Sequence, residues 1–433
     1  MLTSNTVLDA PLLRDDFYCS LLAYSQSAKC LAVGLGSQVY LWSEVRSVSS
    51  NERINSQSSA YVTSLSFSSL HGGRSILAIG RNDGQITLWN PLETDFRFVT
   101  KQRNPISCVS FSSRVAKRPS KRDPVVIVST EELLVGDEAG CISIYAVEWP
   151  SEDEKDLYGW SGDVNLVCRL AVHNQQVCGL AWAPSGKFFA TGGNDNSCCV
   201  FERSRVIRDQ PNRRGETMRD VLKSFNGINI VPAGGAPDQS LSPEQAHERH
   251  RWFVNAAVKA IAFCPWQQGL IAIGGGSNDR CIHFYHVQSG ACLATIDCAA
   301  QVTSLIWSTT RREIAATFGF PQPEHSYRIA VFSWPDCAQI VAIPWADEDR
   351  ALYAISYPGG PNDGRTKGES GSWWSRTEEE GCIVVATSGA SIKFHEVWSE
   401  ARKATSPRKG TLGGSDILEL LHGIEKDDAD IIR

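Results

Sequence analysis

The chain has 433 residues, of which 42% are hydrophobic and 21% charged, and its formal net charge is -6. This composition is ordinary for a folded globular protein, and the negative charge disfavours a nucleic-acid binder that depends on overall positive charge. No apolar run approaches the roughly 18 residues of a membrane span, and the first residues lack the basic and apolar segments of a leader peptide. We therefore expect neither a nucleic-acid nor a membrane partner, and a location in the nucleus, the cytoplasm or both.

A strand pattern that recurs along the chain is the first sign of internal repeats. Each copy has apolar residues at alternate positions and ends on an aromatic residue, as in a strand with one buried face. The copies are VTSLSF, ISCVSF, VCGLAW, VKAIAF and VTSLIW, at residues 62–67, 106–111, 177–182, 258–263 and 302–307.

A second pattern follows these copies and consists of a strand, a turn rich in Gly, Asn and Asp, and another strand. This order predicts a β-hairpin. The copies are LAIGRNDGQITLW, LLVGDEAGCISIY, FATGGNDNSCCVF and IAIGGGSNDRCIHFY. The glycines at 274–276 in the last copy lead into a strand and lack the G-x-G-x-x-G or G-K-[ST] spacing of phosphate-binding loops. They therefore predict a turn, and we expect no cofactor.

The repeat spacing predicts a propeller. Phe67 and Phe111 are 111 − 67 = 44 residues apart, within the roughly 40–45 residues of a four-stranded propeller blade. Residues 30–42 and 382–398 also carry the hairpin pattern, which brings the number of blades to seven. The sequence therefore predicts an all-β, seven-bladed WD40-type propeller, closed into a ring that leaves no sheet edge exposed.

The domain boundaries follow from where the repeats are interrupted and where they end. We expect the propeller to cover residues 1–398, with long inserted loops at about 202–250 and 358–381. Residues 399–433 form a polar tail that we expect to be flexible. A short amphipathic stretch in the tail predicts a helix capped by Ser415.

Cysteines and basic residues offer other interpretations that we weigh against plain structural roles. The 14 cysteines lie mostly in β-patterned segments, and no two are spaced as Cys-x-x-Cys, so we expect small buried apolar groups and no metal site. His247 and His250 are spaced as possible metal ligands, but a polar loop is their simpler setting. The basic run RVAKRPSKR, residues 114–122, could be a nuclear-localisation or nucleic-acid patch. We interpret it instead as a solvated loop.

Some segments go beyond a generic repeat. They include LDAPLLRDDFYCSLLAYS, QVCGLAWAPSGKFFATGGNDN, AVKAIAFCPWQQGLIAIGGGSNDRCIHFYHVQSGACLATID and a terminal Ile-Arg. Together these closely resemble the fizzy and fizzy-related family, which are propeller activators and substrate receptors of the anaphase-promoting complex, a ubiquitin ligase. Sequence divergence and the insertions indicate a fungal, meiosis-type member. The resemblance implies a non-catalytic protein that recruits substrates or inhibitors carrying short degron peptides.

In this family the central top surface of the propeller receives the Lys-Glu-Asn degron. The matching positions here are Asn194, Asn196, Ser277, Gln301 and Arg350. Amides and a hydroxyl can satisfy the peptide backbone and the degron asparagine, and a guanidinium can pair with its glutamate. Asparagine and serine are also common turn residues in any propeller, so a purely structural role is the alternative.

The resemblance also implies a destruction-box groove between the first and last blades and a docking tail. Asp9 matches one acid that meets the arginine of the destruction box, whereas the second acid falls on residues 389–391, Gly-Ala-Ser. Ile432 and Arg433 match the tail that docks on a helical-repeat scaffold subunit of the ligase. A phosphate on Ser406, which precedes a proline, could modulate that docking.

Three function classes remain open from the sequence. The first is a substrate receptor and activator of the anaphase-promoting complex. The second is a binding-only adaptor, since the Asp-Arg-Tyr-Ile-Pro-like box of the family has no match in the residues before Asp9. The third is an enzyme, which we rank last because no Ser-His-Asp set, recognisable carboxylate pair or metal-ligand spacing appears.

Overall fold

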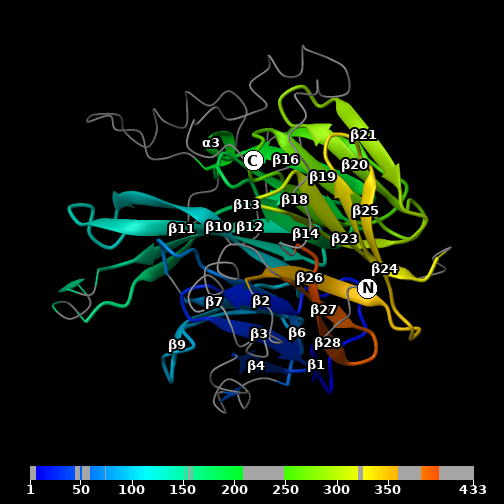
Figure 1. The fold of residues 1–433 in the computed structure, drawn as a ribbon. Helices are drawn as coiled ribbons and strands as arrows, with labels where there is room; N and C mark the ends of the chain where they lie inside the picture. The colour runs from blue at the N-terminus through cyan, green and yellow to red at the C-terminus, as the bar shows by residue number, and fades with distance from the viewer. Residues whose placement is uncertain are drawn as a thin grey trace, which may run out of the picture.

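The computed structural model describes residues 6–43, 49–50, 59–73, 75–151, 153–154, 157, 159–207, 248–319, 325–358 and 382–398. These residues form seven four-stranded sheets, which confirms the predicted seven-bladed propeller. The sheets, or blades, follow one another around the molecule in chain order (Figure 1). No helix among the described residues is long and apolar enough to cross a membrane.

Blades 1 to 4 are built from consecutive strands of the first part of the chain. Blade 1 comprises β2 (Leu22–Ser25), β3 (Cys30–Leu35), β4 (Gln38–Trp42) and β5 (Ser49–Ser50). Blade 2 comprises β6 (Val62–Phe67), β7 (Leu77–Arg81), β8 (Gln85–Trp89) and β9 (Phe96–Lys101). Blade 3 comprises β10 (Ile106–Pro119), β11 (Ile127–Asp137), β12 (Cys141–Trp149) and β13 (Asp163–Ala171). Blade 4 comprises β14 (Val177–Trp182), β15 (Phe188–Gly193), β16 (Ser197–Glu202) and β17 (Glu248–Phe253), with the short helix α3 (Arg203–Val206) after β16.

Blades 5 to 7 complete the ring. Blade 5 comprises β18 (Val258–Phe263), β19 (Leu270–Gly275), β20 (Cys281–His286) and β21 (Cys292–Asp297). Blade 6 comprises β22 (Val302–Trp307), β23 (Glu313–Phe318), β24 (Tyr327–Ser333) and β25 (Gln339–Pro344). Blade 7 comprises β26 (Ala351–Tyr357), β27 (Cys382–Thr387) and β28 (Ser391–Glu396), and β1 (Thr6–Asp9) is its fourth strand.

The ring is closed by strands from the two ends of the propeller. β1 pairs with β28 in antiparallel register, with Asp9 opposite Ser391. The outer strand of the last blade therefore comes from the start of the chain, and every sheet reaches four strands. Because strands from both ends of the propeller are joined in one sheet, the ring can open only if the hydrogen bonds between them break.

The predicted repeats agree with the observed strands. Each of the five aromatic-ended copies coincides with the first strand of a blade or, in blade 3, with its first part. The glycines at 274–276 lie at the end of β19 and in the turn before β20, as predicted. Both ends of the expected 202–250 loop lie in regular elements, because α3 covers residues 203–206 and β17 begins at Glu248.

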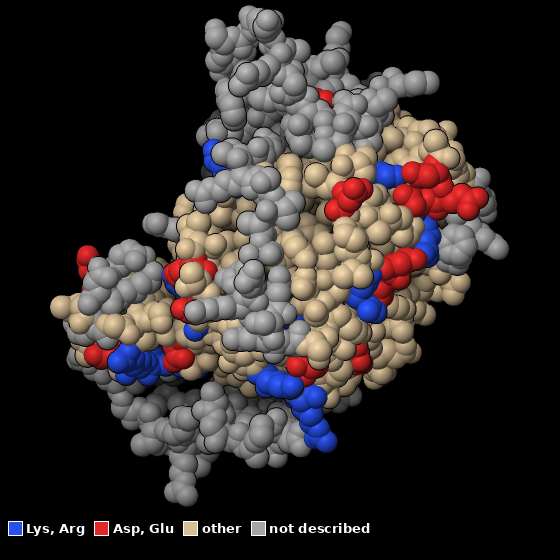
Figure 2. Space-filling model, turned by 90° about the horizontal axis from the view of Figure 1, so that it is seen from below, with Lys and Arg blue, Asp and Glu red and all other residues tan. Residues whose placement is uncertain are grey.

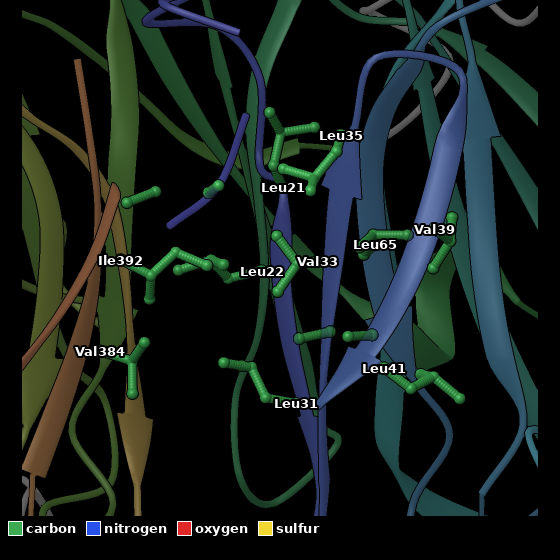
Figure 3. Packing of buried hydrophobic residues seen from close by; sticks show 14 of the residues in the cluster. Leu21, Leu22, Leu31, Val33, Leu35, Val39, Leu41, Leu65, Val384 and Ile392 are labelled. Carbon is green, nitrogen blue, oxygen red and sulfur yellow. The ribbon is translucent and has the colours of Figure 1, made fainter. Parts of the chain in front are cut away.

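The core lies between neighbouring blades, because the strands of each sheet present apolar residues to both sides. Leu22 and Leu31 of blade 1 are buried in one cluster with Val384 and Ile392 of blade 7. Figure 3 shows these side chains facing one another across the junction. Since full burial of such a side chain stabilises by about 1.5–3 kcal/mol, each blade junction contributes substantially to the stability of the ring.

Most of the cysteines are buried, as the sequence predicts. All 14 are free thiols, and ten of them are buried. Burial raises the pKa of Cys168 and of Cys108 to about 12, so both thiols are protonated at neutral pH. They pack as small apolar groups, not as thiolates.

Blade 3 extends beyond its neighbours, and this extension overturns one expectation. The basic run at 114–122 was expected to be a solvated loop, but residues up to Pro119 continue β10 and pair with β11. Arg118 Nη2 lies 2.6 Å from Glu132 Oε1, and Ser120 Oγ donates to Glu148 Oε2 at 2.7 Å. Within this part of β10, Arg118 is therefore paired with a carboxylate of β11, whereas Arg114 and Lys117 are exposed. Figure 1 shows β10 and β11 projecting away from the ring.

The charged surface is mixed in sign. Figure 2 shows one face of the molecule, where Lys and Arg side chains lie beside Asp and Glu side chains in small groups. Such groups are locally balanced, so that face carries no broad field of one sign among its described residues.

A buried hydrogen-bond network fixes the turn of blade 4. His173 Nδ1 lies 3.0 Å from both Asp195 Oδ1 and Ser197 Oγ, and His173 Nε2 lies 2.9 Å from Thr191 Oγ1. Burial alone would raise the pKa of Asp195, but the hydrogen bonds from His173, from the Asn174 amide and from Ser197 outweigh it and lower that pKa. The ionised carboxylate therefore stabilises the folded state at neutral pH.

We expect Asp195→Asn to lower the free energy of unfolding by about 1.5 kcal/mol at pH 7, because it removes a charged hydrogen-bond acceptor from a buried histidine. Asp83 occupies the same position in the turn of blade 2 but is more exposed, at 32% against 10%. Asp83→Asn should therefore cost under about 0.5 kcal/mol. Urea unfolding checks both values. The difference between wild type and Asp195→Asn should shrink as the pH falls below about 4, and a difference that stays constant there would contradict this account.

Candidate functional site

The polar residues selected from the sequence lie at one end of the propeller. Asn194 and Asn196 occupy the β15–β16 turn, and Ser277 occupies the β19–β20 turn. The main-chain carbonyl of Gln301 accepts the amide of Gly319, which follows β23, at 2.9 Å. The main-chain carbonyl of Arg350 accepts the amide of Ser388, which follows β27, at 3.0 Å. All five residues therefore lie at the end of the propeller where the second strand of each blade ends. They belong to four successive blades. We call this end the top face.

The two asparagines of blade 4 have different roles. Asn194 Nδ2 donates to Gln175 Oε1 at 2.8 Å, and Asn194 Oδ1 accepts the hydroxyl of Tyr18 at 2.9 Å. Asn196 has a positive φ of 63°, and its carbonyl accepts the amide of Val254 at 2.9 Å. Asn tolerates this left-handed conformation better than most residues. Asn196 therefore shapes the turn through its backbone, whereas Asn194 presents a side-chain amide among other polar side chains.

Arg350 lies beside blade 7 and meets the start of the chain. Its guanidinium forms an ion pair with Asp15, and its main-chain amide donates to Ser388 Oγ at 2.9 Å. The side chains of Arg350 and Asp15 are 31% and 45% exposed. The guanidinium is thus held at the surface by an acidic group that solvent can still reach.

The segment between β1 and β2, residues 14–20, connects these polar groups across the top face. We call it the entry segment. Its Asp15 contacts Arg350 of blade 7, while its Tyr18 contacts Asn194 of blade 4. Asp16 Oδ1 accepts the amide of Tyr18 at 2.9 Å, which shapes the segment locally. The entry segment therefore adds two carboxylates and a phenol to the polar top face.

A buried lysine anchors the entry segment at the centre of the ring. Lys259, in the first strand of blade 5, donates from Nζ to the carbonyl of Cys19 at 2.9 Å and to that of Leu352 at 3.1 Å. The rings of Phe17 and Tyr353 lie 5.2 and 5.0 Å from Nζ. Burial lowers the pKa of Lys259 to about 8. One ammonium therefore joins blade 5, blade 7 and the entry segment.

Sequence reasoning missed the contributions of Asp15, Tyr18, Gln175 and Lys259 to this site. The sequence signal for the first two was the acidic and aromatic string RDDFY directly after LDAP. Its contacts could not be read from the sequence, because Asp15 and Arg350 are 335 residues apart.

The second candidate site centres on Asp9, which is exposed on β1. The turn at 389–391, where the family has another acid, carries no acidic side chain in this chain. A side chain on Gly389 would collide with Asp349, whose Oδ1 lies 2.3 Å from the position of the added Cβ. Asp349 is itself paired with Lys393 at 3.3 Å. A carboxylate thus lies beside this turn, but a lysine of the same blade already balances its charge.

One group of potential metal ligands occurs among the described residues, at Asp279, Cys281 and His283. Asp279 Oδ2 lies 2.8 Å from His283 Nε2, and Asp279 Oδ1 accepts the amide of Asn255 at 3.1 Å. Burial, followed by the nearby carboxylates, raises the pKa of the Cys281 thiol to about 11. The carboxylate therefore serves the β19–β20 turn, and the thiol is protonated at neutral pH. His250, the other histidine weighed for metal binding, stacks on Trp252 in β17.

Several sequence predictions fall outside the described residues. These are the docking residues Ile432 and Arg433, the phosphorylation candidate Ser406, the helix cap Ser415, and His247. They remain predictions.

Comparison with known proteins gives the family. Residues 8–361 match the CDC20/Fizzy WD40 domain. The chain is 30% identical to the meiosis-specific APC/C activator protein AMA1 of Saccharomyces cerevisiae, over 97% of this chain and 62% of the relative. It is 32% identical to the meiotic fizzy-related protein 2 of Schizosaccharomyces pombe, over 96% of this chain and 68% of the relative. The chain thus spans about two thirds of the length of these relatives.

A solved structure is also similar. The propeller matches a chain in the crystal structure of a mitotic checkpoint complex with a TM-score of 0.64 and 26% identity, covering 92% of this chain and 96% of that one. The fold, the family match and the meiotic relatives agree with one another. The chain therefore belongs to the CDC20/Fizzy family of WD40 proteins.

Proposed function

We propose that this chain is a substrate-recognition and activator subunit of the anaphase-promoting complex that binds degron peptides on its top face. The observation that carries the proposal is the polar surface formed by Asn194, Arg350 and the entry segment around the buried Lys259. Amide, guanidinium and carboxylate groups together can recognise a short peptide that contains amide, acidic and basic side chains. The proposed location is the nucleus, the cytoplasm or both.

The geometry supports a distinct role for each polar group in binding Lys-Glu-Asn. The glutamate would pair with Arg350 in place of Asp15, whose ion pair is accessible. The lysine would then find the carboxylates of Asp15 and Asp16 in the entry segment. The asparagine would bond to the amide of Asn194, with Ser277 and Gln301 supplying further polar groups on the adjoining blades. Recognition would consist of exchanging internal polar partners for those of the peptide.

In the same proposal, Asp9 receives the arginine of a destruction box with a single carboxylate. One exposed charge pair contributes only about 0.2–1 kcal/mol. We therefore expect destruction-box peptides to bind more weakly than Lys-Glu-Asn peptides, and Asp9→Ala to affect only the former. Competition between two labelled peptides measures the difference.

The proposed docking element is the C-terminal Ile432–Arg433, which we expect to bind a helical-repeat scaffold subunit of the ligase. The test is capture of purified anaphase-promoting complex by the intact chain and by a chain lacking these two residues, at near-physiological salt. We expect capture by the intact chain alone. Equal capture by both would refute the tail as the anchor.

Ubiquitin transfer separates this proposal from the binding-only adaptor. An activator should stimulate transfer to a substrate that carries Lys-Glu-Asn, and Arg350→Glu should abolish the stimulation. A chain that binds the degron peptide but leaves transfer unchanged would instead be an adaptor. For the wild-type chain, peptide binding in the same sample serves as the control for folding. For Arg350→Glu, the control is a cooperative urea-unfolding transition like that of the wild type.

A further inference from the structure

Two hollows lie at the end of the propeller opposite the top face, where β14 turns into β15. Their volumes are about 320 and 450 Å³. Both are lined by Arg114, Ser185, Lys187, Phe188 and Glu202. Because they share these walls, they form one groove that runs from blade 3 past blade 4 to blade 5. We call it the basic groove.

The charges of the basic groove do not balance. Its lining contains the cations Arg114, Lys187, Arg203 and Arg249 but only the acids Glu132 and Glu202. The two acids are already engaged. Arg203 Nη2 and Arg118 Nη2 each lie 2.6 Å from Glu132 Oε1, and Arg205 Nε lies 2.9 Å from Glu202 Oε2. The groove therefore carries excess positive charge in a chain whose net charge is -6.

Arg114 and Lys187 are the groove cations without an acidic partner among the described residues. Arg114 is held in place because its Nε donates to the carbonyl of Pro184 at 3.3 Å, and its stem packs where a side chain on Gly186 would otherwise lie. Lys187 is exposed. Two cations, one held by a main-chain carbonyl and one exposed, thus face the same groove, and both are available to an acidic ligand.

One wall of the groove is the open edge of a strand, which differs from the expectation that no sheet edge would stay exposed. β10 lies at one edge of its sheet, and its consecutive residues Arg114, Val115 and Ala116 line the larger hollow. Val115 and Ala116 pair with Glu131 and Thr130 of β11 on one side only. In an antiparallel pair, alternate residues turn their N–H and C=O groups away from the partner strand. The groove is therefore bordered by main-chain groups that can accept another strand.

We propose that the basic groove binds an acidic peptide segment of a partner protein. The segment would add as an extended strand to the free edge of β10, which is the edge that does not pair with β11. Main-chain hydrogen bonds along the edge would supply affinity, as in other strand additions. Arg114 and Lys187 would select acidic side chains. This site is separate from the degron surface, because the β14–β15 turn lies at the opposite end of β15 from the β15–β16 turn.

The test uses a fluorescent peptide of alternating glutamate and valine, about eight residues long, which is within the usual length of a strand. We expect saturable binding by the full chain, measured by fluorescence anisotropy, and no binding of the lysine-valine counterpart. Lys187→Glu should weaken binding at least about tenfold. Arg350→Glu, a matched charge reversal on the top face, should leave it unchanged.

Two further readouts test strand addition itself. N-methylation of alternate peptide residues removes the donors that face β10 in one register, so at least one of the two methylated registers should fail to bind. Hydrogen exchange at Val115 or Ala116 should slow when the peptide binds. Equal binding by the lysine-valine peptide, or no effect of Lys187→Glu, would overturn the proposal. Unchanged affinity of both methylated registers would overturn strand addition. Lys-Glu-Asn binding in the same samples reports separately on the degron surface.

Discussion

A peptide that contains Lys-Glu-Asn is expected to bind Arg350→Glu about 100-fold more weakly than the wild-type chain. Reversing the charge replaces an attraction for the degron glutamate by a repulsion, and charged pairs at interfaces are worth about 2–5 kcal/mol when they are hydrogen-bonded. Arg350 is 31% exposed, so we take the lower part of that range, about 3 kcal/mol. Anisotropy titration of a labelled peptide gives the affinity.

The same experiment has two internal controls. Lys187→Glu carries an equal charge change at the opposite end of the propeller and should bind the degron peptide as the wild type does. Asp15→Asn should change binding by no more than about fivefold, because it removes both the internal partner of Arg350 and one of the two carboxylates offered to the degron lysine, and each exposed ion pair contributes little. If Arg350→Glu and Lys187→Glu bound equally well, the glutamate would not be read by Arg350.

Lys259→Met is expected to change how stability depends on pH. The lysine has a folded-state pKa of about 8 against 10.5 for an ordinary lysine. Because the pKa of this base is lower in the folded state than in the unfolded state, folding disfavours its charged form. The resulting penalty is about 3 kcal/mol below pH 8 and is relieved as the pH rises from about 8 to 10.5.

Methionine lacks this titration while it keeps most of the volume of the lysine stem. The free energy of unfolding of the wild type, relative to Lys259→Met, should therefore increase by about 2 kcal/mol between about pH 7.5 and 9.5. Both proteins share the buried thiols, whose raised pKa values destabilise the folded state at high pH, so their effect cancels in the comparison. Urea unfolding at several pH values measures this increase, and a pH-independent difference would show that folding does not shift the pKa of Lys259.

The sequence predicted the ring because its inner strands repeat with a regular pattern. Apolar alternation ending on an aromatic residue located β6, β14, β18 and β22 to the residue. The turns between strands were recognisable because Gly, Asn and Asp tolerate the backbone angles that turns require. Local patterns were sufficient here because each blade is built from neighbouring segments.

The extension of β10 was not predictable in the same way. Its residues are mostly polar or basic, and a strand whose charges are paired with Glu132 of a neighbouring strand shows no apolar alternation. Lys259 was missed for a related reason. A lysine in the repeat VKAIAF looks solvent-exposed, whereas its partners Cys19 and Leu352 are 240 and 93 residues distant along the chain.

The candidate site was predicted in part. Resemblance pointed to Asn194 and Arg350, and the structure places both on the top face in contact with the entry segment. The sequence did not show that Asp15 and Tyr18 contact these two side chains, because the contacts join residues 335 and 176 positions apart in the chain. Contacts of this kind depend on the whole topology.

The pairing of β1 with β28 also has a consequence for biosynthesis. The first strand leaves the ribosome nearly 400 residues before its partner, since β1 begins at Thr6 and β28 ends at Glu396. At about 5–20 residues per second, β1 waits about 20–80 seconds for that partner. During this interval the growing chain carries an unsatisfied strand at its leading end and an incomplete blade at its trailing end. Until the last blade is made, the edge of β1 that later pairs with β28 is therefore open to pairing with other chains.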